Sequence, residues 1–176
     1  MKNIVVIILG MLMLVSCGPA KELTPEEKAE KLQREQVISS AIENKGFVIE
    51  AHTVYDKYGE SYNMSPSINF VLVNNEDGTI QLGFDQIVGW NGVGGITLDG
   101  KVRDYKVVER EGSLPSISFS MNGVSVGNVT LNVSVNSHGM ATAVVNGNWG
   151  ERITFRGQFR SLSESSIYKG NTNYPM

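Results

Sequence analysis

The segments PSISFSMNG (residues 115–123) and NVTLNVSVN (residues 128–136) decide the fold of this 176-residue chain. Over most of both segments an apolar side chain occupies every second position, and Ser, Thr or Asn fills the positions between. A period of two is typical of a β-strand with one buried and one solvated face. Asn122-Gly123 ends the first segment and tolerates the positive φ that tight hairpins require. We therefore predict two consecutive antiparallel strands.

The same alternation recurs along most of the chain, with turn-forming residues between the runs. Further runs lie near residues 47–55, 68–73, 80–85 and 152–160, and strands near residues 102–108 and 140–145 are expected to fill the gaps. Roughly eight short strands joined by tight turns favour an antiparallel meander. Eight such strands can close into a barrel. We predict a mainly β fold of this kind, with a β-sandwich as the alternative.

The apolar set of each run is expected to point into the barrel. These sets are Phe47, Ile49, Ala51, Thr53 and Tyr55; Ile68, Phe70 and Leu72; Ile80, Leu82 and Phe84; Ile117, Phe119 and Met121; Val129, Leu131, Val133 and Val135; and Ile153, Phe155 and Phe159. Most of them are bulky, which favours an interior filled by the protein itself over one that holds a ligand.

One α-helix is predicted before the strands. Thr24 is a good N-cap, Pro25 suits the first helical position, and Glu27 completes a capping box. No Gly or Pro interrupts the following residues before Asn44, and the helix is expected to span 24–45. Its first half is mostly charged, so we expect only the second half to pack on the strands.

The N-terminus has the parts of an export signal. Lys2 precedes an uncharged apolar run of 12 residues, from Ile4 to Val15. A membrane-spanning helix needs about 20 residues, so a permanent span is disfavoured. Leu14-Val15-Ser16-Cys17 resembles the bacterial lipobox, in which Cys17 is lipidated and cleavage precedes it. The alternative is an ordinary signal peptide with a chance cysteine.

Composition excludes several classes of function. Cys17 is the single cysteine, so the chain forms no internal disulfide and has no cysteine-based zinc site. Removing residues 1–16 takes away Lys2 and no acid, which moves the net charge from −3 to −4. A net acidic chain argues against nucleic-acid binding. We expect no cofactor.

These observations give a predicted organisation along the chain. Residues 1–16 form a lipoprotein signal peptide, 17–23 a lipidated tether, 24–45 the helix and 46–162 the barrel domain. Residues 163–176, rich in Ser and Asn, are predicted to be a loose tail.

Several motifs together resemble a family of Bacteroidota lipoproteins known as domain of unknown function 4251. They are Gln81-Leu82-Gly83-Phe84, the loop from Gly89 to Ile96, Leu98-Asp99-Gly100-Lys101-Val102 with Tyr105, Ile117-Ser118-Phe119, and Ile153-Thr154-Phe155-Arg156-Gly157. The resemblance spans Phe47 to Phe159 and implies a lipocalin-like β-barrel. It implies no activity and no catalytic residues.

Residues with catalytic potential do not converge in the sequence. The two histidines, His52 and His138, have no metal-ligand spacing, and no Gly-x-Ser-x-Gly elbow is present. We predict that the protein is not an enzyme; the alternative is a hydrolase with an unrecognised site.

Two features are candidates for binding. Trp90, Asn91 and Val93 lie in a glycine-rich loop that either recognises a partner or folds inward as a plug. Arg152, Arg156 and Arg160 fall on one face of a predicted strand. They can receive an anionic partner, or they are solvated and paired with acids of a neighbouring strand.

The sequence therefore favours a non-enzymatic cell-envelope lipoprotein, anchored by Cys17 and expected at the outer membrane. Its partners are the membrane and either an envelope component bound outside the barrel or a small apolar ligand inside it. No nucleic-acid partner is expected.

Overall fold

A computed structural model describes residues 23–84, 92, 94–123, 127–147 and 150–171. The elements in chain order are α2 (Pro25–Glu43), β1 (Gly46–Tyr55), β2 (Ser61–Asn63), β3 (Phe70–Asn74), β4 (Asp77–Leu82), β5 (Ile96–Arg110), β6 (Ser113–Gly123), β7 (Gly127–Val135), β8 (Met140–Gly147), β9 (Arg152–Ser161) and the 3-10 helix η2 (Leu162–Glu164). The chain divides into two units, Met1–Glu30 and Lys31–Met176, and all strands belong to the second.

In the first unit, the described residues form the start of α2. The backbone N–H of Thr24 donates to Glu27 Oε2 at 2.7 Å, and the N–H of Glu27 donates to Thr24 Oγ1 at 3.2 Å. These two bonds satisfy donors that a helix start leaves unpaired. The predicted capping box is thus confirmed.

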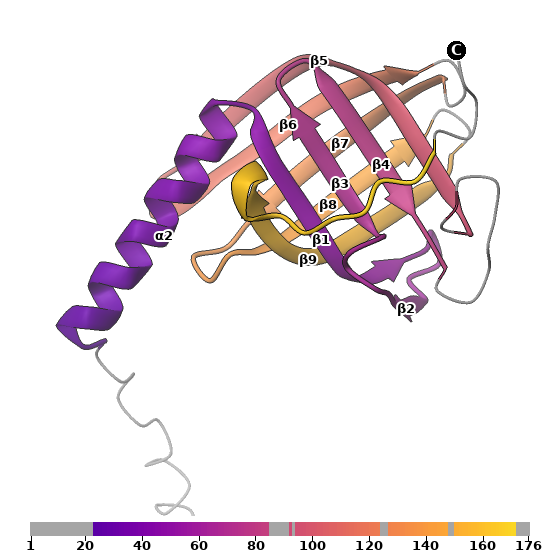
Figure 1. Ribbon diagram of the computed structural model, residues 1–176. Helices are drawn as coiled ribbons and strands as arrows, with labels where there is room; N and C mark the ends of the chain where they lie inside the picture. The colour runs from indigo at the N-terminus through magenta and orange to yellow at the C-terminus, as the bar shows by residue number, and fades with distance from the viewer. Residues whose placement is uncertain (1–22, 85–91, 93, 124–126, 148–149, 172–176) are drawn as a thin grey trace, which may run out of the picture. The chain divides into compact units, whose positions relative to one another are not determined.

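The second unit is a closed antiparallel barrel. Its strands follow the order β1-β3-β4-β5-β6-β7-β8-β9, and pairing of β1 with β9 closes the ring (Figure 1). Every neighbouring pair from β3 onward is consecutive in sequence, and most pairs are joined by short turns, as predicted; residues 83–95 connect β4 to β5 instead. The prediction of an eight-stranded meander closed as a barrel is confirmed. The structure adds β2, a three-residue exposed strand paired with the end of β1.

A bulge in β1 allows the ring to close. The register between β1 and β9 shifts between Ala51 and Thr53, opposite Gly157. A Cβ on Gly157 would lie 1.8 Å from the carbonyl oxygen of Glu50, so this crossing needs glycine. Because the bulge adds one residue, the strand reverses its faces beyond it. Val54 is therefore buried, and the expectation that Thr53 and Tyr55 point inward is wrong.

The predicted register of β3 is also wrong. Val71 and Val73 belong to the barrel core, whereas Phe70 and Leu72 lie on the opposite face. Phe70 is nevertheless buried, with 0% of its surface exposed. A strand that is apolar on both faces carries no alternation from which to read its register. Phe84, expected inside, lies beyond the end of β4 and is exposed.

The strands β6, β7 and β9 follow the predicted alternation, and β8 alternates in the same way. Phe119 pairs with Leu131, and both are buried. Val145 pairs with Leu131 on the next strand and is also buried. The polar residues between them stay half-buried or exposed. These strands have one solvated face, which is why their pattern was readable.

The chain after η2 is bound to the barrel and is not a loose tail as far as residue 170. This C-terminal segment, residues 165–170, runs across the outer side of β1, β3 and β4 (Figure 1). The N–H of Tyr168 donates to the carbonyl of Ser67 at 2.7 Å, and Lys169 Nζ lies 2.7 Å from Asp99 Oδ1. The bonds use mostly backbone groups, which a Ser- and Asn-rich composition does not reveal.

Candidate functional site

The barrel interior is occupied by the protein's own side chains. The apolar residues that point inward form one buried cluster that includes Phe47, Phe119, Leu131 and Phe155. The rings of Phe47 and Phe159 stack with centroids 5.1 Å apart. In the described part of the chain, therefore, the buried inward residues pack against one another as a core.

The second half of α2 contributes to that core. Ile38, Ala41 and Ile42 are buried in the same cluster, as the predicted apolar half of the helix required. The hydroxyl of Tyr105 donates to the carbonyl of Ile42 at 2.7 Å, and its ring stacks on Phe119 at 5.8 Å. Burial raises the pKa of Tyr105 above its ordinary value. This tyrosine is thus a neutral structural group that ties the helix end to β5 and β6.

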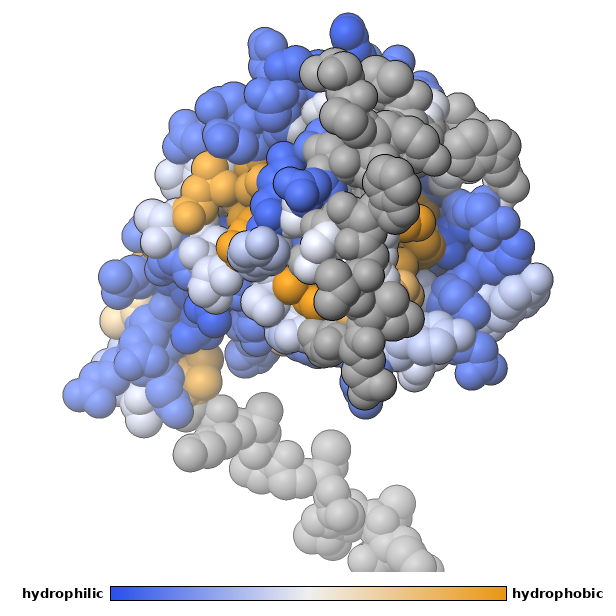
Figure 2. Space-filling view, turned by 45° about the vertical axis from the view of Figure 1, so that its right-hand side comes forward, coloured by the Kyte–Doolittle hydropathy of each residue, from blue (hydrophilic) through white to orange (hydrophobic). Residues whose placement is uncertain are grey.

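On the side that Figure 2 shows, the described surface is mostly hydrophilic, with hydrophobic residues in separate patches. Among the described residues, the large exposed hydrophobic side chains lie on α2, on β2, β5 and η2, or in connecting and terminal segments. None lies on β6, β7, β8 or β9. The outer surface of these four strands therefore has no large exposed apolar side chain among its described residues.

The three arginines predicted as an anion-facing stripe do share the outward face of β9. Arg152, Arg156 and Arg160 are all exposed. Arg160 Nε lies 3.9 Å from Glu50 Oε2 on the neighbouring strand. The described ion pairs do not include Arg152 or Arg156. The acid-paired alternative thus holds for Arg160, whereas the other two arginines border the outer face of β8.

Beside these arginines lies a surface that we call the polar face, the outward positions of β6, β7 and β8. Ten of its twelve residues are Ser, Thr or Asn, and none is charged. They are Ser116, Ser118, Ser120, Asn122, Asn128, Thr130, Asn132, Ser134, Met140, Thr142, Val144 and Asn146. Pairing of the three strands sets these side chains in rows across the sheet.

Basic residues border the polar face on both sides. On β5, Arg103 pairs with Ser120 and Lys106 pairs with Ser118. On β9, Arg152 pairs with Asn146. Acids are present at this border as well: Asp104, at a β5 bulge with a φ of 52°, accepts a hydrogen bond of 3.2 Å from Ser120 Oγ, and exposed Glu109 lies farther along β5.

The opposite outer region, which we call the covered face, comprises the outward residues of β1, β3 and β4 beneath the C-terminal segment. Gln81 is 0% exposed and binds that segment through both ends of its amide. Its Nε2 donates to the carbonyl of Tyr168 at 2.8 Å, and its Oε1 accepts from the N–H of Gly170 at 2.8 Å. Thr97 Oγ1 also donates to Gln81 Oε1, at 3.0 Å. The C-terminal segment is thus recognised mainly through its backbone.

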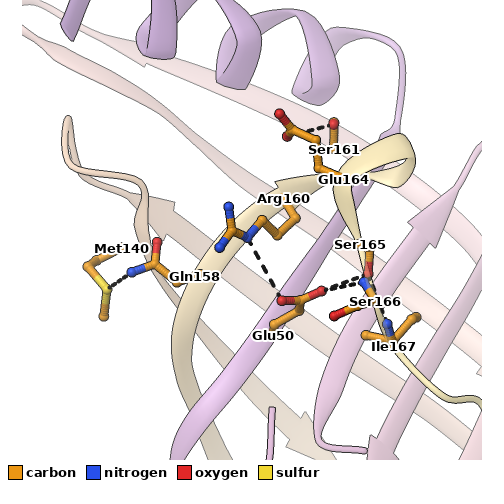
Figure 3. A network of polar contacts seen from close by, with 9 residues as sticks. All are labelled: Glu50, Met140, Gln158, Arg160, Ser161, Glu164, Ser165, Ser166 and Ile167. Atoms are coloured by element: carbon orange, nitrogen blue, oxygen red, sulfur yellow. Dashed lines mark hydrogen bonds and ion pairs between the residues drawn. The ribbon is translucent and has the colours of Figure 1, made fainter. Parts of the chain in front are cut away.

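Glu50 binds the start of the same segment. Its Oε1 accepts from Ser165 Oγ at 2.8 Å and from the N–H of Ser166 at 3.1 Å. Figure 3 shows the carboxylate between these groups and Arg160. All of its described contacts therefore serve to hold the C-terminal segment and β9.

The remaining predicted site residues are not brought together. Cys17 and the loop residues Trp90, Asn91 and Val93 lie outside the described residues. His52 is exposed beside the β1 bulge, where its Nδ1 lies 3.0 Å from Thr53 Oγ1. His138 is exposed in the turn between β7 and β8. Within the described ranges, no three His, Cys, Asp or Glu side chains cluster as a metal site would require.

Sequence reasoning missed the polar face and the covered face for different reasons. The alternating Ser, Thr and Asn of β6 and β7 were visible, but one strand at a time. Only the strand register shows that Arg103 and Arg152 end the same row. For the covered face, the apolar outward residues Val48 and Phe70 were a signal that something packs over them.

A likeness to a known family now adds to these observations. The family model described as domain of unknown function (DUF4251) matches residues 29–159. No curated protein matches the chain significantly. Among the helices that the structure describes, none is both long enough and apolar enough to cross a membrane.

A solved structure of the same family is similar in both sequence and fold. It is the crystal structure of a DUF4251 family protein from Bacteroides eggerthii, 31% identical, with a TM-score of 0.64. The similarity covers 79% of this chain and 95% of that one. The family match extends over α2 from residue 29 and over nearly all of the barrel. On these grounds the chain belongs to the DUF4251 family.

Proposed function

We propose that this protein is a non-enzymatic lipoprotein of the cell envelope, anchored by Cys17, whose barrel binds a partner through its outer surface. The filled interior is the observation that carries the proposal. A carrier barrel keeps space inside for its ligand. Here Phe47, Phe119 and Phe155 are all at most 1% exposed within one continuous cluster. Binding is therefore assigned to the exterior, and the alternative of an interior apolar ligand is not favoured.

The proposal of a non-enzymatic role rests on the contacts that the ionisable side chains make. Catalytic acids and bases converge in a cleft with a free reactive edge. Glu50 is instead hydrogen-bonded to Ser165 and Ser166 and faces Arg160. The Tyr105 hydroxyl is bound to a helix carbonyl. Both groups are engaged in contacts that stabilise the fold, which supports a non-enzymatic role.

Anchoring is supported by the sequence Leu14-Val15-Ser16-Cys17 after an uncharged apolar run. One acyl chain binds a membrane only marginally, whereas two or more anchor it stably. Lipidation of Cys17 would thus hold the barrel at a membrane, which we propose is the outer membrane.

Metabolic labelling with a fatty acid tests the anchor. The full chain should take up label and fractionate with membranes, and Cys17→Ala should remain unlabelled and uncleaved. A wild-type protein without label would overturn the lipoprotein proposal.

Titration with an apolar fluorescent probe tests whether binding occurs inside the barrel. We expect no saturable one-to-one binding to the folded protein. Saturable binding that Phe119→Trp abolishes, with the fold retained, would favour the interior carrier instead. The titration should use the full chain with Cys17→Ala in mild detergent, so that attached lipid does not compete.

A further inference from the structure

The polar face carries no charged residue, and nearly all of its side chains can form hydrogen bonds. About a quarter to a third of a typical surface consists of charged residues, so three or four of its twelve positions would ordinarily be charged. None is, and ten carry a hydroxyl or an amide. Such side chains both donate and accept hydrogen bonds. They therefore suit a ligand that presents hydroxyl groups.

The border residues supply positive charge at both ends of one row. Arg103, Ser120, Thr130, Asn146 and Arg152 are paired in succession from β5 to β9. Four inter-strand spacings of about 4.8 Å separate the two arginines by roughly 19 Å along the sheet. An extended ligand lying along this row would meet a guanidinium at each end and hydrogen-bonding groups between them.

The neighbouring row is basic at one end. Lys106, Ser118, Asn132, Val144 and Thr154 are paired in succession across the same strands. Thr154 stands next to Arg152 and Arg156 on the outward face of β9. The face therefore carries uncharged and mostly hydrogen-bonding rows, with basic residues on both bordering strands.

We infer that the polar face binds an acidic polysaccharide, lying across β5 to β9. This inference rests on the proposed function and names the partner's chemical class. Hydroxyls of the polymer exchange hydrogen bonds with Ser, Thr and Asn, and its acidic groups pair with Arg103, Lys106, Arg152 and Arg156. Charge-assisted hydrogen bonds from guanidinium groups suit carboxylate, sulfate and phosphate alike.

A membrane surface fits this face less well. Proteins that lie on lipid insert exposed apolar side chains beside their basic residues. The described residues of β6 to β9 include no large exposed hydrophobic side chain, and the exposed Val107 and Val108 of β5 lie at one end of the border, beyond Lys106. The bordering charges also lie far apart, which suits a chain of regularly spaced acidic groups.

A binding titration with oligogalacturonate, a carboxylated polysaccharide, tests the inference. It uses the full chain with Cys17→Ala in mild detergent, and neutral dextran serves as the control polymer. We expect saturable binding of the acidic oligomer, little binding of dextran, and weakening as salt is raised. Arg103→Gln combined with Arg152→Gln should weaken binding roughly tenfold, because it removes two exposed charge pairs with the polymer.

Two further variants separate charge from location. Lys28→Gln combined with Lys31→Gln removes the same charge from α2 and should leave the affinity unchanged. Asn132→Asp places a negative charge in the middle of the polar face at nearly constant shape and should weaken binding. If the helix variant loses as much affinity as the arginine variant, net charge alone is responsible, and the inference is overturned.

Vesicles containing phosphatidylglycerol distinguish failure of this inference from failure of the proposed function. If the arginine variant loses vesicle binding while oligogalacturonate does not bind the parent chain, the face binds lipid and the polysaccharide inference is wrong. The proposed exterior binding would then stand. If no variant alters binding of either probe, the polar face is not a binding surface.

Discussion

The covered face and the polar face are both outer surfaces of one barrel, yet they are built on opposite principles. On the covered face, Val48, Phe70 and Gln81 point outward and are at most 1% exposed, and Gln81 binds the C-terminal segment. On the polar face, Asn132 and Thr130 are exposed, and their neighbours are almost all polar. The difference shows that the outside of a barrel can be a second core or a free surface, depending on what lies over it.

The two faces also differ in how their polar groups are used. Gln81 has every described hydrogen bond directed at the protein itself. Among the described residues, no buried side-chain nitrogen or oxygen lacks a partner. On the polar face, the hydroxyls of Ser116 and Ser120 donate to β5, whereas the described hydrogen bonds do not include the side chains of Thr130 or Asn132. Substitutions on the covered face should therefore lower the stability of the protein, whereas substitutions on the polar face should weaken binding.

Phe70→Ala should have the largest effect on stability. The side chain is as buried as one in the interior, so its truncation should lower the free energy of unfolding by about 3–5 kcal/mol. Phe119→Ala, which truncates a true interior residue, is the matched control and should cost a similar amount. Denaturant unfolding measures both. A cost below about 1 kcal/mol for Phe70 alone would mean that the C-terminal segment does not cover it.

Gln81→Leu should lower the free energy of unfolding by about 2 kcal/mol, because it leaves buried backbone groups of the C-terminal segment without partners. Hydrogen exchange should also show faster exchange at the amide of Gly170. Gln158→Leu is the control, since half-buried Gln158 donates to Met140 Sδ at 3.0 Å and not to that segment. Equal effects of the two substitutions would argue against backbone recognition by Gln81.

Glu50→Gln should have a smaller effect, on the order of 1 kcal/mol, because the amide keeps an acceptor for Ser166 but loses the charge that faces Arg160. Thermal unfolding at low and high salt measures the change. The difference between wild type and variant should shrink as salt screens the pair. A difference independent of salt would assign the effect to hydrogen bonding alone.

Asn132→Ala should change the free energy of unfolding by no more than about 0.5 kcal/mol, as expected for an exposed side chain on a solvated face. Denaturant unfolding with the same protocol as for Phe70→Ala gives the contrast between the faces directly. A loss above about 2 kcal/mol would show that Asn132 stabilises the fold and is not merely a surface residue.

The smallest effect concerns Lys101, next to the polar face. Its hydrogen bond to Asp77 at 2.6 Å, and then the charge of Asp77, raise the pKa of the lysine in the folded state. A raised pKa means that the stabilisation is present below the ordinary value of 10.5 and is lost as pH rises through the folded pKa. The difference in stability between wild type and Lys101→Gln should therefore persist at pH 8 and decline above pH ~10.5. A pH-independent difference would contradict this origin.

How much of the fold could be predicted depended on the exposure of each strand. The strands β6 and β7 face water on one side, so their alternation gave the correct register for Phe119 and Leu131. The strand β3 is apolar on both sides, so the same reasoning placed Phe70 inside. The β1 bulge at His52 reverses which residues of the strand face inward beyond it, and the residue types of β1 do not indicate this reversal. Such features depend on tertiary contacts.

The candidate site was predictable only in part. The outward arginines of β9 followed from alternation, but the pairing of Arg160 with Glu50 needed the closure of the ring. The row that joins Arg103 to Arg152 runs across five strands, and no local pattern encodes it. The backbone contacts of the C-terminal segment with Gln81 likewise have no signature in side-chain composition.

The side-chain amide signals of asparagine allow the most direct test of the central claim, that binding belongs to the polar face. Asn122, Asn128, Asn132 and Asn146 report on this face, whereas buried Asn69, whose Oδ1 accepts from Gly83, reports on the covered side. In an NMR titration of the full chain with oligogalacturonate, we predict saturable shifts of the first four amides and none at Asn69. Shifts confined to Asn69, or to methyl groups of the interior such as Leu131, would contradict the account.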